Sequence, residues 1–506
     1  MKRIGDRFRQ SVTGYDFVFW LLVVGCVAFA LSSYPMMKLR FDMWQHIGNI
    51  DRLIFDPNAK ITRSNWHATW AFIIRSIGSG DVFANATFVH RAQFILIGII
   101  IYHAAKQLFA ALLPQIEFSD ARNKSQWLSS LAISSVIVWF TIIGTVSTFQ
   151  QAWIMWYSVN YQITLTFLLL ALALFVNVVS VEQKNVSKTV KLVSSLFLLV
   201  LIYLFHAGEL AYLVFYFPIL LICFSNKGNY KKTLIITLTI LIVIFFAEKF
   251  YTDIRPTLVK YLLEGNFNEI STEIKRRGTY LINGGNRYSG NWNELYMLSA
   301  LLAVPVALIA LLKSSFVNKR VLLFIILSLI FCFIPNFKYI SGLTALISYD
   351  EIVNRYYFAS FIFLLLPLCL YLVLSNFKII HSPSWLILFT MLSIGLVFTY
   401  SKIINNKGAY YKNAKSIINS LDQKRVGVET SVSEIESIGQ QIKAAQAQYG
   451  TENIIYCSTY DKGHIVKYVH RQENIAFWRD PVYYLFNLDE CEKYVKLKNK
   501  LVVIIN

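Results

Sequence analysis

Residues 356–375 read YYFASFIFLLLPLCLYLVLS, a run without a charged side chain. A helix rises about 1.5 Å per residue, so a run of this length spans roughly 30 Å, the thickness of the hydrocarbon core of a bilayer. Similar runs recur along the chain and predict about eleven transmembrane helices. The other runs lie near 16–35, 93–113, 128–148, 161–181, 190–206, 208–225, 233–249, 295–313, 320–338 and 384–401. The sequence therefore predicts a polytopic α-helical membrane protein.

The overall composition agrees with this fold class. Hydrophobic residues make up 56% of the 506-residue chain, which is more than the core of a soluble protein requires. The 48 Lys and Arg residues exceed the 29 Asp and Glu residues, but they form short clusters between the apolar runs. A nucleic-acid site needs a continuous basic patch, so we expect no nucleic acid and instead membrane lipids or anionic sugars as partners.

The basic clusters also predict how the chain is oriented in the membrane. Residues 1–10 carry four basic side chains, and the short loops after even-numbered runs are rich in Lys and Arg. The positive-inside rule then places the N-terminus in the cytoplasm, as a retained signal anchor, and the tail outside. One alternative stays open at residues 206–209, where a broken helix or a re-entrant hairpin would invert the segments that follow.

The outer face is predicted to carry most of the soluble mass, in loops 36–92 and 250–294. Segment 36–92 spaces its tryptophans, Trp66 and Trp70 among them, at helical intervals, which predicts amphipathic helices in the membrane interface. Residues 1–401 would form the membrane domain.

The tail, residues 402–506, lacks long apolar runs and is predicted to form a small periplasmic α/β domain. A helix is expected at 432–448 and strands at 454–457, 465–469 and 501–505. Cys457 and Cys491 either form a disulfide there or stay free.

An acid and an imidazole follow the first apolar run. Asp42 and His46 are four residues apart and would share one face of a helix, with Asp51 shortly beyond. A carboxylate at this position is suited to take the proton of an acceptor hydroxyl, and the histidine to orient it. The alternative is that all three are solvated loop residues.

This placement of Asp42 resembles the GT-C superfamily of membrane glycosyltransferases, which put an essential acid in the first outer loop. The resemblance implies transfer of a sugar from a polyprenyl-phosphate donor with inversion, and Asp42 as base or acceptor ligand. Metal-dependent members pair two acids, whereas Met43 follows Asp42 here, so neither a metal nor another cofactor is expected. The layout is most similar to serotype-converting O-antigen glucosyltransferases of the Gtr type from phage-derived clusters, which implies glucose as donor sugar and O-antigen as acceptor.

A second feature agrees with this resemblance. Arg355 and Tyr356 stand at the entrance of the tenth run, where several GT-C families carry a similar pair. A guanidinium matches phosphate oxygens bidentately. An interfacial aromatic belt with a snorkelling arginine is the alternative. Further substrate-binding candidates are polar or aromatic residues within or between apolar runs, each with the alternative of a plain turn or solvated loop: His206, Glu209, Arg276, Arg277, Glu294 and Trp66.

The sequence thus predicts a glycosyltransferase of the bacterial inner membrane that uses an undecaprenyl-phosphate-linked sugar to modify a periplasmic polysaccharide. It has no Gly-rich nucleotide loop and no nucleophile elbow, so a nucleotide-sugar donor is not expected. The alternatives are an O-antigen polymerase or ligase, a flippase or transporter of lipid-linked sugars, and a non-catalytic scaffold.

Overall fold

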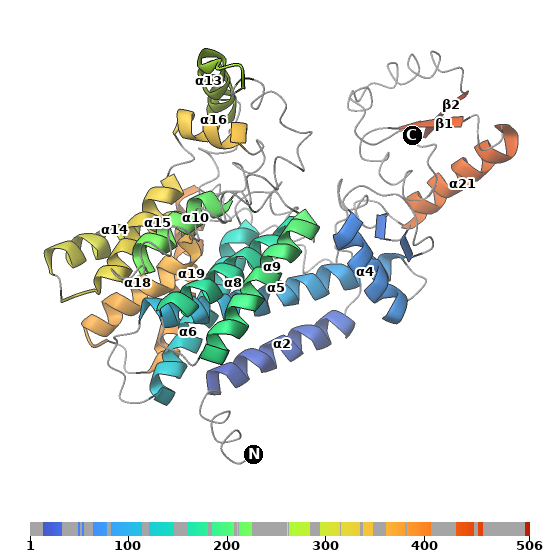
Figure 1. Cartoon of the computed structure of the whole chain (residues 1–506). Coiled ribbons are helices and arrows are strands. Elements are labelled where there is room, and N and C mark those ends of the chain that lie inside the picture. Colours follow the sequence, from blue (N-terminus) through green and yellow to red (C-terminus); the bar gives the residue numbers. More distant parts are fainter. Residues whose placement is uncertain are drawn as a thin grey trace. The chain divides into compact units, whose positions relative to one another are not determined.

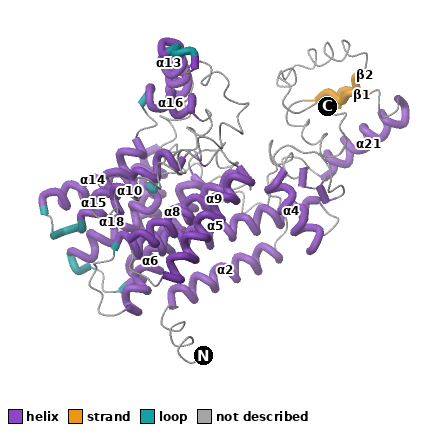
Figure 2. Tube along the Cα trace, viewed as in Figure 1, coloured by secondary structure: helices purple, strands orange, loops and turns teal. Residues whose placement is uncertain are grey.

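The protein is described by a computed structural model (Figure 1). The described residues are 14–32, 49–50, 53–54, 64–77, 82–113, 121–145, 160–180, 185–206, 210, 212–224, 261, 263–283, 294–313, 315–333, 337–347, 361–379, 382–405, 432–449, 454–458 and 501–505. They are almost all helical, as Figure 2 shows.

The chain divides into two compact units. The first comprises residues 1–28, 95–151 and 160–415, and the second comprises 29–94, 152–159 and 416–506. The predicted domain border between residues 401 and 402 stays a prediction.

A helix lies at each predicted apolar run except 233–249, which lies outside the described residues. These helices are α2 (Gly14–Ser32), α5 (Val82–Leu112), α6 (Ala121–Thr145), α8 (Asn160–Ser180), α9 (Asn185–His206), α10 (Leu213–Phe224), α14 (Glu294–Leu312), α15 (Lys319–Phe333), α18 (Ile362–Asn376) and α19 (Pro383–Asn405). Among the described residues, three helical stretches are both long and apolar enough to cross a membrane: Ile95–Leu112, Val186–Phe205 and Pro383–Ile403. A helical membrane protein is confirmed at this level, and the number of eleven crossings stays a prediction.

One helix extends beyond its apolar run, and one predicted boundary was wrong. Helix α5 starts at Val82 because the polar segment before the apolar run continues the helix, and its membrane-length stretch Ile95–Leu112 agrees with the predicted run 93–113. Helix α15 ends at Phe333 rather than near residue 338, and a separate helix, α16 (Lys338–Ile347), follows. Pro335 lies between them and disfavours helical geometry in the residue before it.

Helix α18 is the centre of the first unit. It contacts α6, α14, α15 and α19, and its side chains from Ile362 to Cys369 are all buried. A helix that is apolar all round is stable only when neighbours cover every side. Helix α9 is different, because only 17% of its apolar stretch is buried. Most of its apolar surface is therefore left uncovered by the rest of the chain.

Three further described helices that precede the tail lie outside the apolar runs. Helices α13 (Phe267–Asn283) and α16 pack against each other in the first unit. In the second unit, α4 (Ser64–Ile77) has one buried face, with Trp66 and Trp70, and one exposed face, with Phe72 and Ile77. This amphipathic pattern is the one predicted for segment 36–92, and its place in the membrane interface stays a prediction.

The tail contains α21 (Val432–Tyr449) and two parallel strands, β1 (Ile454–Ser458) and β2 (Leu501–Ile505), which pair in the register Ile454 with Leu501. These three elements lie at the predicted helix 432–448 and at the first and last of the three predicted strands. The middle strand at 465–469 and Cys491 lie outside the described residues, so the complete α/β domain and the disulfide stay predictions.

Candidate functional site

Most of the predicted site residues lie outside the described residues. These are Asp42, His46, Asp51, Glu209, Arg355 and Tyr356. His206 is the last residue of α9 and Glu294 the first of α14, and only their backbones are described. The site is therefore located through the helices that lead into these segments.

Contacts along α18 establish which helix ends lie together. Trp139 of α6 packs on Phe363, with ring centroids 4.8 Å apart, and Trp127 packs on Tyr371 at 5.2 Å, so α6 and α18 are antiparallel. Asn376, at the end of α18, donates to the carbonyl of Phe316 in the turn after α14. Helix α14 is therefore parallel to α18, and both begin at the same end of the first unit.

The directions of α2 and α9 are established in the same way, from contacts with neighbouring helices. Asp16, in the first turn of α2, bonds Ser129 near the start of α6, so α2 begins where α18 ends. Phe205 of α9 contacts Phe167 of α8, and the far end of α8 is tied to the end of α5 by a bond from Asn177 to the carbonyl of Gln107. We call the end that contains Asp16, Ser129, Asn177 and Asn376 the polar end, and the opposite end the site end.

Several helices of the first unit therefore reach the site end next to candidate residues. Helix α9 ends there at His206, and α14 begins there at Glu294. Helix α18 also begins there, shortly after Arg355 in the chain. Within the first unit, the end of α9 and the starts of α14 and α18 lie at one end of the bundle, and the positions and roles of the candidate side chains stay predictions.

At the polar end, a buried carboxylate joins α2 to α5 and α6. The sequence analysis did not single it out. The Oδ1 atom of Asp16 accepts hydrogen bonds from the Tyr102 hydroxyl, from Lys106 Nζ at 2.5 Å and from Ser129 Oγ at 3.0 Å. The Asp16 side chain is 8% exposed, and a buried charge is stable only when it is paired. The sequence signal that could have revealed this network is Asp16 itself, an acid at the first position of the predicted apolar run 16–35.

The same end is tied together by neutral and charged polar bonds. Ser130 Oγ donates to the Pro383 carbonyl at 2.5 Å, which joins α6 to α19. Lys191 Nζ donates to Asn177 Oδ1 at 2.6 Å, which joins α9 to α8. The polar end thus holds the helices in fixed positions relative to one another.

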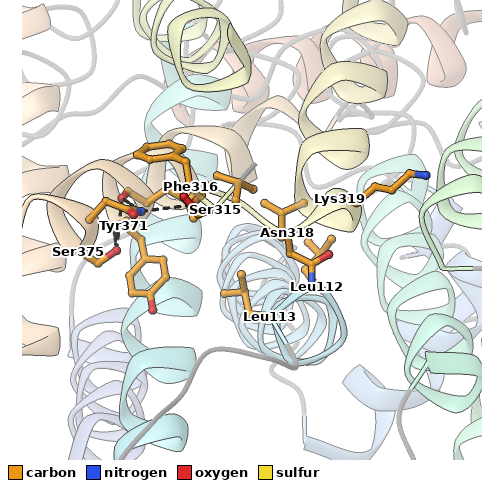
Figure 3. Close-up of a pocket in the computed structure, with 12 residues that line it drawn as sticks. Leu112, Leu113, Ser315, Phe316, Asn318, Lys319, Tyr371 and Ser375 are labelled. Carbon is orange, nitrogen blue, oxygen red and sulfur yellow. Dashed lines mark hydrogen bonds between the residues drawn. The ribbon is translucent and has the colours of Figure 1, made fainter. Parts of the chain in front are cut away.

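A cavity of about 630 Å³ lies at the polar end, between the end of α5, the turn before α15 and the end of α18. Figure 3 shows that Tyr371 and Ser375 lie on one side of it and Asn318 with Leu112 on another. Its polar groups are largely satisfied, because Ser375 Oγ donates to the Tyr371 carbonyl at 2.5 Å and Asn376 bonds two carbonyls. None of the predicted site residues lines it, and it lies at the end opposite the site end.

Arg276 and Arg277 of α13 both bind one carboxylate. Arg276 holds Glu273 through two bonds of 2.6 and 2.7 Å, and Arg277 Nε donates to the same carboxylate at 2.7 Å. The bonds from Arg276, and then those from Arg277, lower the pKa of Glu273 to about 2, despite partial burial that acts in the opposite direction. Glu273 therefore stays ionised at neutral pH, and the trio has one net positive charge. A role of the two arginines in binding an anionic substrate stays a prediction.

Trp66 of α4 is buried in the second unit. It is 1% exposed, and its indole N–H donates to Gln93 Oε1 at 3.1 Å. The ring meets those of His67 and Trp70 edge-on. Stacking of Trp66 on a sugar would require this cluster to open, and that role stays a prediction.

Comparison with solved structures finds similar folds that cover nearly the whole chain. The fold is similar to that of an archaeal oligosaccharyltransferase. AglB from Archaeoglobus fulgidus, in complex with an inhibitory peptide and a dolichol-phosphate, matches with a TM-score of 0.56 and 13% identity over 97% of this chain and 70% of that one. The same organism's oligosaccharyltransferase in complex with Zn and sulfate matches with a TM-score of 0.52 and 13% identity, over 95% and 67% of the two chains.

No protein-family model and no curated protein matches the sequence. The likeness at 13% identity therefore concerns the fold, and it agrees with the GT-C-like architecture predicted from the sequence. The narrower resemblance to Gtr-type glucosyltransferases has no counterpart among these matches.

The described residues contain no group of three His, Cys, Asp or Glu side chains that could hold a metal ion. Asp42, His46 and Asp51 lie outside that part of the chain. The expectation that the enzyme needs no metal stays a prediction.

Proposed function

We propose that the chain is a membrane glycosyltransferase that moves a sugar from a polyprenyl-phosphate donor to a polysaccharide acceptor. The observation that carries this proposal is the fold likeness to oligosaccharyltransferases over 97% of the chain. One of those proteins was solved with a dolichol-phosphate, a lipid phosphate of the class that the proposal requires. The apolar helices are suited to a bilayer, and the prenyl chain of such a donor would lie in that same bilayer.

In the proposed reaction, an acceptor hydroxyl attacks the anomeric carbon of the donor sugar. The bond from that carbon to the phosphate oxygen breaks, and the polyprenyl phosphate leaves with the electron pair. Asp42 takes the hydroxyl proton, and His46 orients Asp42. Attack from the face opposite the leaving phosphate inverts the anomeric carbon.

Arg355 is proposed to hold the leaving phosphate, with Tyr356 beside the prenyl chain. A guanidinium presents two parallel N–H donors to phosphate oxygens, which stabilises the charge that grows as the bond breaks. Arg355 precedes α18 in the chain. The proposed site shared by Arg355 and Asp42 follows the sequence resemblance.

The finer assignments follow the sequence resemblance. We propose glucose as the donor sugar, undecaprenyl phosphate as its carrier and O-antigen as the acceptor. The enzyme would lie in a bacterial inner membrane, with its N-terminus in the cytoplasm and its site end and tail in the periplasm. Serotype conversion would be the biological result.

A second candidate is the transfer of a preassembled oligosaccharide to a peptide. It is favoured by the inhibitory peptide bound to the archaeal oligosaccharyltransferase. The two candidates differ in the acceptor, and both need a lipid phosphate as leaving group.

Mass spectrometry of cells with and without the gene tests the proposal. Our proposal predicts that polysaccharide repeats gain the mass of one hexose when the gene is present. A gain found only on peptides would favour the second candidate. Identical polysaccharides and identical glycopeptides in the two strains would contradict both.

A further inference from the structure

Helices α13 and α16 form a pair in direct backbone contact. A Cβ atom at Gly278 of α13 would collide with the backbone carbonyl of Lys338, and one at Gly342 of α16 would collide with the carbonyl of Ile274. Arg277 also donates to the carbonyl of Ala345 at 3.4 Å. Figure 1 shows the two helices crossing side by side. They therefore move as one body.

Helix α16 turns its small residues toward this contact. Ser341 and Ala345 are buried with Gly342, and at about 100° per residue the three share one side of the helix. The large side chains Tyr339 and Leu343 lie on the other side and are 62% and 44% exposed. Helix α16 thus has two apolar faces, of which α13 covers one.

Beyond its first residue, the exposed Phe267, helix α13 differs from α16. Its exposed side carries polar residues such as Glu269, Thr272 and Arg276, as expected for a face in contact with water. The pair is therefore asymmetric, with a polar outer side on α13 and an aromatic and aliphatic outer side on α16.

Together with the predicted crossing of α15, the chain length before α16 limits how far this apolar side can lie from the membrane. Helix α15 begins with Lys319 and Arg320, which belong at headgroup level, and its fifteen residues rise about 22 Å through a hydrocarbon core of about 30 Å. Phe333 would then lie about 8 Å short of the opposite edge of that core. Lys338 follows five residues later, and an extended chain of that length reaches at most about 17 Å. Helix α16 can therefore start no more than about 9 Å beyond the hydrocarbon edge, which is within or beside the headgroup layer.

We propose that α16 lies in the membrane interface, with Tyr339 and Leu343 inserted among the lipids, and that it carries α13 on its water-facing side. Aromatic and aliphatic side chains on one face of a helix are typical of helices that lie in the plane of the interface. The glycine contacts then hold α13 at a fixed height above the bilayer, with Glu273 and its arginines near the level of the lipid phosphates.

Depth-dependent fluorescence quenching tests this placement on the full chain in nanodiscs. An environment-sensitive fluorescent amino acid is introduced at Leu343, and in a control variant at Thr272 on the polar side of α13. Nitroxide-labelled lipids should quench the fluorophore at 343 and leave that at 272 unchanged. A water-soluble quencher should give the reverse order. A third variant labelled at Tyr339 repeats the test on the same face if the first variant does not fold.

Two results would overturn the proposal. One is a fluorophore at 343 and 339 that the water-soluble quencher reaches as well as the one at 272. The other is protection from both quenchers together with photo-crosslinking at 343 to a second copy of the chain, which would identify that copy as the occupant. Because no step of this test involves sugar transfer, its outcome is independent of the proposed activity.

Discussion

Substitution of Gly342 by alanine should loosen the α13 and α16 pair. The added Cβ would meet the main-chain carbonyl of Ile274, which no change of side-chain rotamer can move. Alanine by itself would stabilise the helix by about 0.5–1 kcal/mol relative to glycine, whereas overpacking of a close contact costs about 1–3 kcal/mol. The expected net loss is about 1–2 kcal/mol, a factor of roughly 5–30 in the equilibrium between separated and packed helices.

Hydrogen exchange of the full chain in nanodiscs measures this loss. Amides of α13 and α16 should exchange roughly 5–30-fold faster in Gly342→Ala, since local opening sets their exchange. Gly395→Ala in α19 is the matched control, because a Cβ there has nothing within 4 Å. Its exchange should be unchanged or slower. If Gly342→Ala leaves α13 and α16 as protected as in the unchanged chain, the close glycine contact does not exist.

The remaining predictions concern the donor, the polar end and metal dependence. Arg355→Ala should weaken apparent donor affinity roughly 10- to 100-fold, because a charged hydrogen bond contributes about 1.5–3 kcal/mol. Arg355→Lys should recover only part of it, and unchanged affinity in titrations of Arg355→Ala would move the phosphate site elsewhere. Asp16→Asn should destabilise the protein in detergent unfolding by about 3 kcal/mol, because Lys106 loses its charged partner. The double variant Asp16→Asn with Lys106→Met should regain much of that loss, and equal stability of all three forms would make the pair irrelevant. Transfer by the purified enzyme should survive EDTA, and a loss restored by a divalent cation would reveal a metal site.

The helices of the bundle were predictable because long apolar runs of sequence favour the helix as the structure that satisfies the backbone in a bilayer. Helix α18 is the clearest case, since an apolar run without charges has few other stable environments. The boundaries were less predictable. The start of α5 lies in a polar segment before the apolar run, and α16 lies almost wholly after the predicted run 320–338, in a connection where no helix was predicted.

The site was harder to predict than the fold. Asp16 carries a buried network that depends on Tyr102 and Ser129, residues far away in the sequence, and no local pattern reveals such a meeting. Trp66 was a substrate-binding candidate in the sequence, whereas in the structure its indole N–H donates to Gln93 in a buried cluster. Burial of a tryptophan depends on the partners that the fold supplies, and spacing alone does not identify them.

The central claim is that Asp42 assists the acceptor hydroxyl in sugar transfer. The most direct measurement is the rate at which purified Asp42→Asn transfers sugar from a polyprenyl-phosphate donor, in protein whose folding and membrane insertion match the unchanged enzyme. Asparagine keeps the shape of the side chain but cannot take up the proton, and general-base assistance contributes about 10²- to 10⁴-fold in rate. We predict a loss of that size, with Asp42→Glu in between and a smaller loss in His46→Ala. A fully active Asp42→Asn enzyme would contradict the assignment of Asp42 and remove the main residue-level support for the proposed reaction.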